Sequence, residues 1–114
     1  MCNLKILNRT SNGILIFCSR NEMYQLSFNN LIFNLSSYEI LRFSSYLKEI
    51  DSDYWEKEYE NSVYERKIPI PTLQSNFIIL LDKKELDELC YLIDFKKNKY
   101  LLKFKEIDYN LIYN

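Results

Sequence analysis

This chain of 114 residues offers few of the side-chain arrangements on which catalysis usually depends. Histidine is absent, which removes the commonest general base and the imidazole metal ligand. Nucleophiles activated by histidine are therefore excluded. A single glycine, Gly13, cannot build a glycine-rich phosphate loop. The 16 acidic residues offer many carboxylate pairs, but no pair is marked out by its spacing. We therefore expect no enzymatic activity and no cofactor.

The three cysteines, Cys2, Cys18 and Cys90, are too few and too widely spaced for a structural zinc site. Such a site needs four cysteine or histidine ligands with close pairs. Asn21 stands where a Cys-x-x-Cys motif beginning at Cys18 would close. We expect Cys90 to be a core thiol on the apolar face of a helix, and Cys2 to be a surface thiol. The pattern predicts no metal site and no disulfide framework, and hence a reducing cytoplasm.

An acidic segment with interleaved aromatic residues is the first candidate binding site. Residues 49–65 hold seven acidic residues and one lysine, a net charge of −6, together with the only tryptophan, Trp55. Such a surface can dock on a basic partner or imitate nucleic acid, with the aromatic rings as anchors and the carboxylates steering association. The opposing interpretation is a solvated helix end with Trp55 turned into the core. The candidate partner-binding residues are Tyr54, Trp55, Glu56, Glu58, Tyr59 and Glu60.

A basic segment near the C-terminus is the second candidate, with five lysines in residues 96–105. Lysines with interleaved aromatic residues can hold single-stranded nucleic acid by charge and stacking. Because the segment has no arginine, we expect contacts with the RNA backbone and no reading of base edges. It could equally form a basic outer face of a docked C-terminal element, or pair with the acidic segment. The candidate nucleic-acid-binding residues are Lys96, Lys97, Lys99, Tyr100, Lys103 and Lys105.

The first third of the chain predicts a meander of antiparallel strands, with apolar runs at residues 4–7, 14–18, 23–28 and 31–35. Between the first two runs, Ser11-Asn12-Gly13 is a turn signal in which Gly13 would supply a positive φ. Residues 14–18 are nearly all apolar, which is typical of a strand buried on both faces. Residues 23–28 alternate, so we expect Tyr24, Leu26 and Phe28 on one face.

Two helices follow from capping-box spacings, Ser36 with Glu39 and Asp82 with Glu85. Their predicted buried faces are Ile40, Phe43, Leu47 and Ile50 in the first helix and Leu86, Leu89, Cys90 and Ile93 in the second.

The regions around these helices are less regular. We expect an irregular helical turn up to residue 61 and an extended edge segment over residues 63–70, confined by Pro69 and Pro71. Residues 75–81 predict a strand. Residues 96–114 fit either a helix or a strand, since both spacings of apolar residues occur there.

These elements together predict a single α+β domain over residues 1–114. An antiparallel sheet, with an N-terminal meander of about four strands plus one or two later strands, would pack against two helices. Residues 1–95 would form the core and residues 96–114 a lysine-rich C-terminal extension. A net charge of −1 argues against wholesale electrostatic binding to nucleic acid or membrane. No apolar run approaches the ~18 residues of a membrane span, and the start lacks signal-peptide features, so we expect a soluble cytoplasmic protein.

Several short stretches resemble a family of short uncharacterised bacterial proteins that is classed only as a domain of unknown function. They are Asp53-Tyr54-Trp55-Glu56, residues 66–74, Cys2, Gly13 and residues 26–30. The resemblance covers residues 2–93 and leaves out the lysine-rich tail. It implies a Cys-x-x-Cys motif where Cys18 and Asn21 stand, so that any metal site of the family is lost here. It supports the fold boundaries and implies no activity.

The sequence favours binding as the function class, with an enzyme that uses carboxylate or lysine chemistry as the least favoured alternative. Phage-encoded inhibitors of bacterial immunity, including CRISPR inhibitors, resemble this chain in size, in lacking catalytic residues and in having a charged docking surface. We therefore predict a non-enzymatic regulator or inhibitor of a larger protein or ribonucleoprotein, with a CRISPR effector as the specific hypothesis. The alternative is an RNA-binding accessory protein that uses the C-terminal lysines. Partner identity, strand order and oligomeric state are left open.

Overall fold

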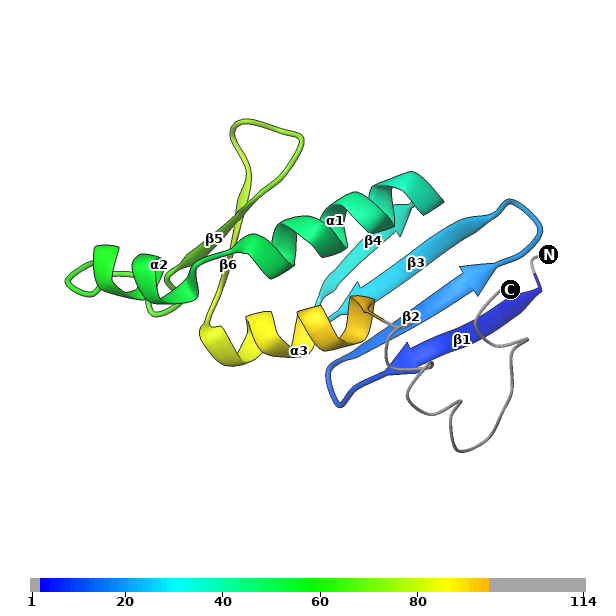
Figure 1. The fold of residues 1–114 in the computed structure, drawn as a ribbon, viewed down its shortest axis with the longest axis horizontal. Helices are drawn as coiled ribbons and strands as arrows, with labels where there is room; N and C mark the ends of the chain where they lie inside the picture. The colour runs from blue at the N-terminus through cyan, green and yellow to red at the C-terminus, as the bar shows by residue number, and fades with distance from the viewer. Residues whose placement is uncertain (1–2, 95–114) are drawn as a thin grey trace.

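The computed structural model of the protein describes residues 3–94, which fold into two antiparallel sheets and three helices (Figure 1). In chain order the elements are β1 (Leu4–Arg9), β2 (Gly13–Cys18), β3 (Met23–Phe28), β4 (Leu31–Leu35), α1 (Ser37–Glu49), α2 (Ser52–Glu58), β5 (Ile68–Pro71), β6 (Ile78–Leu81) and α3 (Lys83–Ile93). The predicted α+β class is confirmed.

The first four strands form a meander in the order β1-β2-β3-β4, as expected. Positive φ values occur at Glu22 and Asn29, in the turns after β2 and β3. Gly13 does not have a positive φ, so the predicted reason for this glycine was wrong. A Cβ atom at Gly13 would lie 2.5 Å from Cδ2 of Leu92 and 2.8 Å from the carbonyl oxygen of Ser27. Glycine is therefore needed there for space, where α3 crosses the start of β2.

Strand β1 carries a bulge that changes which side chains meet α3. Ile6 pairs with Ile16 and Asn8 with Leu15, so Leu7 is the extra residue. Leu7 is buried, and Nδ2 of Asn8 donates to the backbone oxygens of Tyr91 and Leu92 at 3.0 and 3.2 Å. Because of the bulge, the consecutive residues Leu7 and Asn8 both lie on the α3 side of the sheet.

Helices α1 and α3 lie side by side across one face of the four-stranded sheet (Figure 1). Both predicted capping boxes are present, at Ser36 with Glu39 and at Asp82 with Glu85. Their apolar faces meet the inward residues of β2 and β3, and the alternation predicted for β3 is confirmed. The fully buried side chains of this core include Leu7, Leu15, Leu26, Phe28, Leu47 and Leu92.

The region between α1 and α3 departs most from the prediction. The expected irregular turn is a regular helix, α2. The expected strands were too long, because only residues 68–71 and 78–81 pair. They form a separate hairpin, β5–β6, whose buried side chains Ile68, Ile70 and Leu81 join the core. None of the described helices has the length and apolar character of a membrane span.

Candidate docking surface

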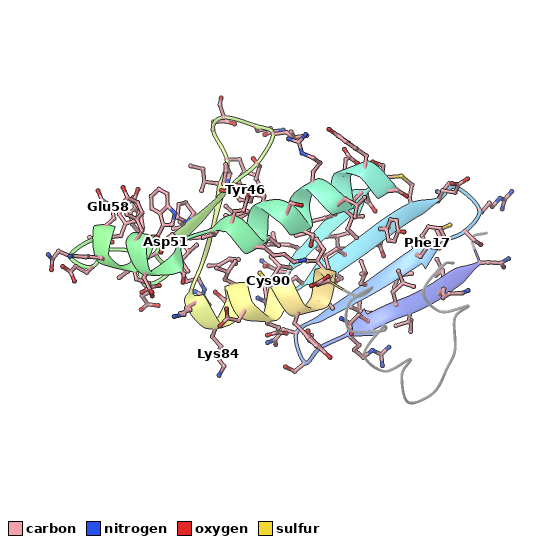
Figure 2. All side chains as sticks on the ribbon, in the orientation of Figure 1. Phe17, Tyr46, Asp51, Glu58, Lys84 and Cys90 are labelled. Carbon is pink, nitrogen blue, oxygen red and sulfur yellow. The ribbon has the colours of Figure 1, made fainter. Side chains whose placement is uncertain are left out.

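Helix α2 is a short helix set beyond the sheet by a break after α1. Ile50 caps α1 in an extended conformation, and Asp51 then caps α2 by accepting a hydrogen bond from the backbone nitrogen of Tyr54 at 3.1 Å. Figure 2 shows Asp51 near the junction and Glu58 at the far end of α2. No residue of α2 is fully buried. We call residues 51–65, which comprise α2 and the loop after it, the acidic end.

The aromatic residues of the acidic end form one connected cluster. The ring of Trp55 meets Tyr54 edge-on at 5.0 Å between centroids and stacks on Tyr59 at 5.8 Å with an interplanar angle of 13°. Tyr59 in turn meets Tyr64 edge-on at 6.3 Å. Such pairs add to the burial of the rings. Trp55 is partly buried and packs against the core, so it links the acidic end to the rest of the domain.

Within this cluster the rings differ in exposure. Tyr54 and Tyr64 are 53% and 51% exposed, whereas Trp55 and Tyr59 are half-buried. Beside Tyr64, Val63 is 93% exposed. The sequence left open whether Trp55 belongs to the core or to an interface. Its position favours a supporting role, in which Trp55 and Tyr59 hold the two outer tyrosines in place.

The loop after α2 is ordered by local hydrogen bonds. Oγ of Ser62 donates to the backbone oxygen of Tyr59 at 2.7 Å and accepts from the backbone nitrogen of Tyr64 at 3.3 Å. Nζ of Lys67 donates to the backbone oxygen of Tyr64. These bonds fix the backbone on both sides of Tyr64 without a strand ladder, which explains why residues 63–67 are not part of β5.

Two ion pairs connect the acidic end and the start of β5 to α3. Nε of Arg66 lies 2.7 Å from Oε1 of Glu85, and this hydrogen bond and charge raise the pKa of Arg66. Nζ of Lys83 lies 3.5 Å from Oδ1 of Asp53, and both side chains are largely exposed. Exposed pairs of this kind contribute at most about 1 kcal/mol.

The predicted carboxylates Glu56, Glu58 and Glu60 are differently placed. Glu58 and Glu60 are exposed and Glu56 is half-buried. Among the ion pairs of residues 3–94, none involves these three side chains. The structure thus divides the six predicted partner-binding residues into two groups: Trp55, Glu56 and Tyr59 are half-buried, and Tyr54, Glu58 and Glu60 are exposed.

The other predicted sites have different outcomes. The six candidate nucleic-acid-binding residues, at positions 96–105, lie outside the described residues, as does Cys2. Cys18 is buried and disulfide-bonded, which the sequence did not predict. Cys90 is a free, half-buried thiol, and burial raises its pKa. No group of three or more potential metal ligands occurs in the described part of the chain.

A hollow of the described surface lies between α1 and the end of α3. It has a volume of about 100 Å³ and is lined by Tyr24, Ser37, Ile40, Leu41, Ser44 and Asp94. Pockets for small molecules usually measure about 300–1,000 Å³. The hollow is therefore too small to serve as a typical ligand site.

The sequence did not predict that a carboxylate, Glu88, accepts hydrogen bonds from the β1–β2 turn. Glu88 on α3 accepts hydrogen bonds from Oγ of Thr10 at 2.6 Å and from the backbone nitrogen and Nδ2 of Asn12 at 3.0 and 2.9 Å. These bonds lower the pKa of Glu88. The only signal in the sequence was the polar Thr10–Asn12 turn itself, since nothing there indicates which acid would reach it.

Comparison with known proteins gives one match. A family model described as a family of unknown function (DUF6686) matches residues 1–114. The match includes residues 94–114, which the resemblance drawn from the sequence did not cover. No curated protein and no solved structure matches the chain.

Proposed function

The chain belongs to this family of unknown function, and we propose that it is a non-enzymatic binding module that regulates or inhibits a larger protein or ribonucleoprotein. The proposed docking surface is the acidic end. Tyr54 and Tyr64 are its anchors, Glu58 and Glu60 form its charged rim, and Trp55 supports both.

One observation carries this proposal. The half-exposed rings of Tyr54 and Tyr64 pack against the stacked pair of Trp55 and Tyr59, beside carboxylates that form no ion pair within the described residues. Protein interfaces are enriched in tyrosine, which supplies a large rigid contact with a polar tip. Binding energy concentrates in such aromatic anchors, while charges around them steer encounter and select the partner. The net charge of this region calls for a partner with a basic surface.

The comparisons name no partner, and no match connects the chain with inhibitors of CRISPR effectors. A basic surface is common to proteins that hold nucleic acid. The proposal is therefore limited to a basic protein or ribonucleoprotein surface.

The test is an affinity pull-down of the tagged full chain from native lysate, with and without RNase, followed by mass spectrometry. Three variants are compared: Tyr54→Ala/Tyr64→Ala, Glu58→Lys/Glu60→Lys, and the control Asp87→Lys, which reverses an exposed carboxylate on α3. We expect the first two to lose at least 90% of a captured basic protein and the control to retain it. Capture that is the same in all three variants would refute docking through the acidic end.

Thermal unfolding of the same proteins separates lost binding from lost folding. We expect the binding variants to melt within a few degrees of the parent, because their side chains are exposed. Trp55→Ala is expected to lower the melting temperature clearly, because the indole packs against the core. If Trp55→Ala bound normally and melted normally, the supporting role of Trp55 would be wrong.

The RNA-binding alternative stays a prediction, because the lysines that would carry it lie outside the described residues. The RNase arm of the pull-down tests it. Recovery that disappears with RNase and survives the acidic-end variants would move the function to the lysine-rich segment. Steep loss of single-strand binding with rising salt would accompany it.

A cytoplasmic location is part of the proposal, and the disulfide at Cys18 is the described feature that argues against it. Disulfides persist mainly in oxidising compartments. Quenching intact cells with acid and then alkylating the denatured protein tests the location directly, because Cys18 is buried in the folded protein. We expect Cys18 to be alkylated if the protein works in the cytoplasm, and to be protected if it works in an oxidising compartment.

A further inference from the structure

The four-stranded sheet has a second face, opposite α1 and α3, which we call the outer face. Strand register places its residues in rows: Ile6, Ile16, Gln25 and Asn34 form one row, and Arg9, Ile14, Ser27 and Ile32 form the next. Directly opposed residues share a face of the sheet. No described helix or strand covers this face. Its apolar residues are Leu4, Ile6, Ile14, Ile16, Met23 and Ile32, and Cys18, which pairs with Leu4 and Met23, is the one buried residue of this face within residues 3–94.

The exposure of this face is unusual for a solvated sheet. Leu4, Ile6 and Ile32 are 65%, 49% and 61% exposed. The solvent side of an antiparallel sheet normally carries polar residues, as β3 and β4 do here with Gln25 and Asn34. Strands β1 and β2 instead place aliphatic residues on both faces. Strand β2 in particular has the sequence of a strand buried on both sides, yet its outer residues Ile14 and Ile16 remain partly exposed.

The end of α3 lies beside this apolar half of the sheet. Asn8 of β1 holds the backbone oxygens of Tyr91 and Leu92, and Leu92 packs at Gly13 of β2. The chain therefore leaves α3 next to β1 and β2, the two strands whose outer faces are apolar. Residues 95–114 continue from this point and lie outside the described residues.

The length of this continuation suits the face. Twenty residues span about 30 Å as a helix and more when extended. Crossing from β1 to β4 requires only about 15 Å, since neighbouring strands lie about 4.8 Å apart. A connection around the edge at β1 and across the outer face is therefore within reach.

The composition of the continuation also suits the face. Leu101, Phe104, Ile107 and Leu111 recur at spacings of three or four residues, between five lysines and two acids. Such a segment can bury one apolar side and keep its charges in water. Arg9 is the only charged residue in the two rows of the outer face, so little charge on this face opposes the contact.

We propose that residues 95–114 of the same chain cover the outer face of the sheet, with their apolar side against β1 and β2 and their lysines toward solvent. This inference is independent of the proposed function, because it concerns the opposite side of the domain from the acidic end. It makes the chain a three-layer domain, with the C-terminal segment as the third layer.

Photo-crosslinking of the full chain tests the contact directly. Replacing Ile6 with p-benzoylphenylalanine puts a photoreactive group on the outer face, and the same replacement at Leu73, which is 101% exposed on the β5–β6 hairpin, is the control. Irradiation at Ile6 should yield a product of monomer mass that joins this strand to a peptide within residues 95–114. The control should give no such product. A product of dimer mass would assign the face to a second copy, and no product would leave the segment elsewhere; either result overturns the proposal.

A protease measurement supplies a second, independent test. A lysine-specific endoprotease should cleave after Lys97, Lys99 and Lys103 at least 10-fold more slowly in the full chain than in a synthetic peptide of residues 95–114. The variant Ile6→Asn/Ile32→Asn should lose this protection, while Leu41→Asn/Leu73→Asn should keep it. Cleavage of the unmodified chain at the peptide rate would overturn the proposal even if a variant failed to fold. Protection that rose with protein concentration would instead indicate a second copy.

Discussion

The sheet body, which comprises β1–β4, α1 and α3, and the acidic end bury their side chains to different extents. The body contains fully buried residues on nearly every element, and both of its helices begin with complete capping boxes. In the acidic end, α2 buries no residue fully, and its aromatic rings pack mainly on one another. The body therefore carries the stability of the domain, and the outer side chains of the acidic end are free to change without unfolding it.

This difference suggests a division of roles. Side chains that a fold buries are constrained by packing, because a change of one methylene in the core is felt. Tyr54 and Tyr64 are under no such constraint, since half of each side chain meets solvent. Their concentration beside exposed carboxylates is easier to explain by a partner than by folding. This division would be wrong if a buried residue of the body could be truncated without loss of stability, or if truncating an exposed residue of the acidic end unfolded the domain.

The largest contrast is expected between two aromatic truncations. Phe28→Ala removes a ring that is 1% exposed in the body, and it should lower the free energy of unfolding by about 3–5 kcal/mol. Tyr54→Ala removes a ring that is 53% exposed, and it should change that quantity by no more than about 0.5 kcal/mol. Urea unfolding at neutral pH measures both. Equal losses would show that the acidic end is part of the cooperative core.

A smaller effect is expected where α3 meets the sheet. Gly13→Ala adds a methyl group that would lie 2.8 Å from the carbonyl oxygen of Ser27, which is backbone and cannot turn aside. Overpacking of this kind costs about 1–3 kcal/mol. Denaturant unfolding of Gly13→Ala alongside Ser11→Ala, an exposed neighbour in the same turn, isolates the steric effect. A stable Gly13→Ala protein would mean that the backbone of β3 at Ser27 and the side chain of Leu92 can both shift away from β2.

The sequence predicted the parts of the fold that local chemistry decides. The capping boxes at Ser36 and Asp82 depend on residues three positions apart, and the alternation in β3 depends on neighbours, so both could be read directly. The role of Gly13 could not, because the atoms that exclude a side chain there belong to Ser27 and Leu92, which are distant from Gly13 in the sequence. The lengths of β5 and β6 were also missed. Hydrogen bonds around Ser62 compete with strand pairing before β5, and Phe77, just before β6, is held in a turn by hydrogen bonds with Thr72 and Gln74.

For the candidate site too, the sequence predicted the local features and missed those that depend on packing. Composition alone located the acidic end and named its aromatic residues, because charge and ring content are properties of the sequence. Which rings face solvent depends on how α2 packs, and α2 places Trp55 against the core and Tyr54 outside it. The bonds from Thr10 and Asn12 to Glu88 join segments far apart in the chain, so no local pattern indicated them.

The smallest predicted effect is the pH dependence of the stability that Glu88 contributes to the body. Hydrogen bonds from Thr10 and Asn12 lower the pKa of Glu88 below its ordinary value of 4.5, so the folded state favours its carboxylate form. The stability contributed by Glu88 is thus fully present above about pH 4.5 and is lost as pH falls through the lowered pKa. Glu88→Gln should lower the free energy of unfolding by about 1 kcal/mol at pH 7, because the amide cannot replace all three accepted bonds.

Urea unfolding of the parent and Glu88→Gln at pH 7, 5 and 3.5 tests this prediction. The difference between the two proteins should be largest at pH 7 and should shrink as the pH falls below 4.5 and through the lowered pKa of Glu88. Glu58→Gln, which removes an exposed carboxylate from the acidic end, should leave stability at pH 7 unchanged. Glu88 would then stabilise the body, whereas Glu58 would make no contribution to the stability of the fold. A difference between the parent and Glu88→Gln that did not vary with pH would show that the bonds to Thr10 and Asn12 stabilise the turn by geometry alone.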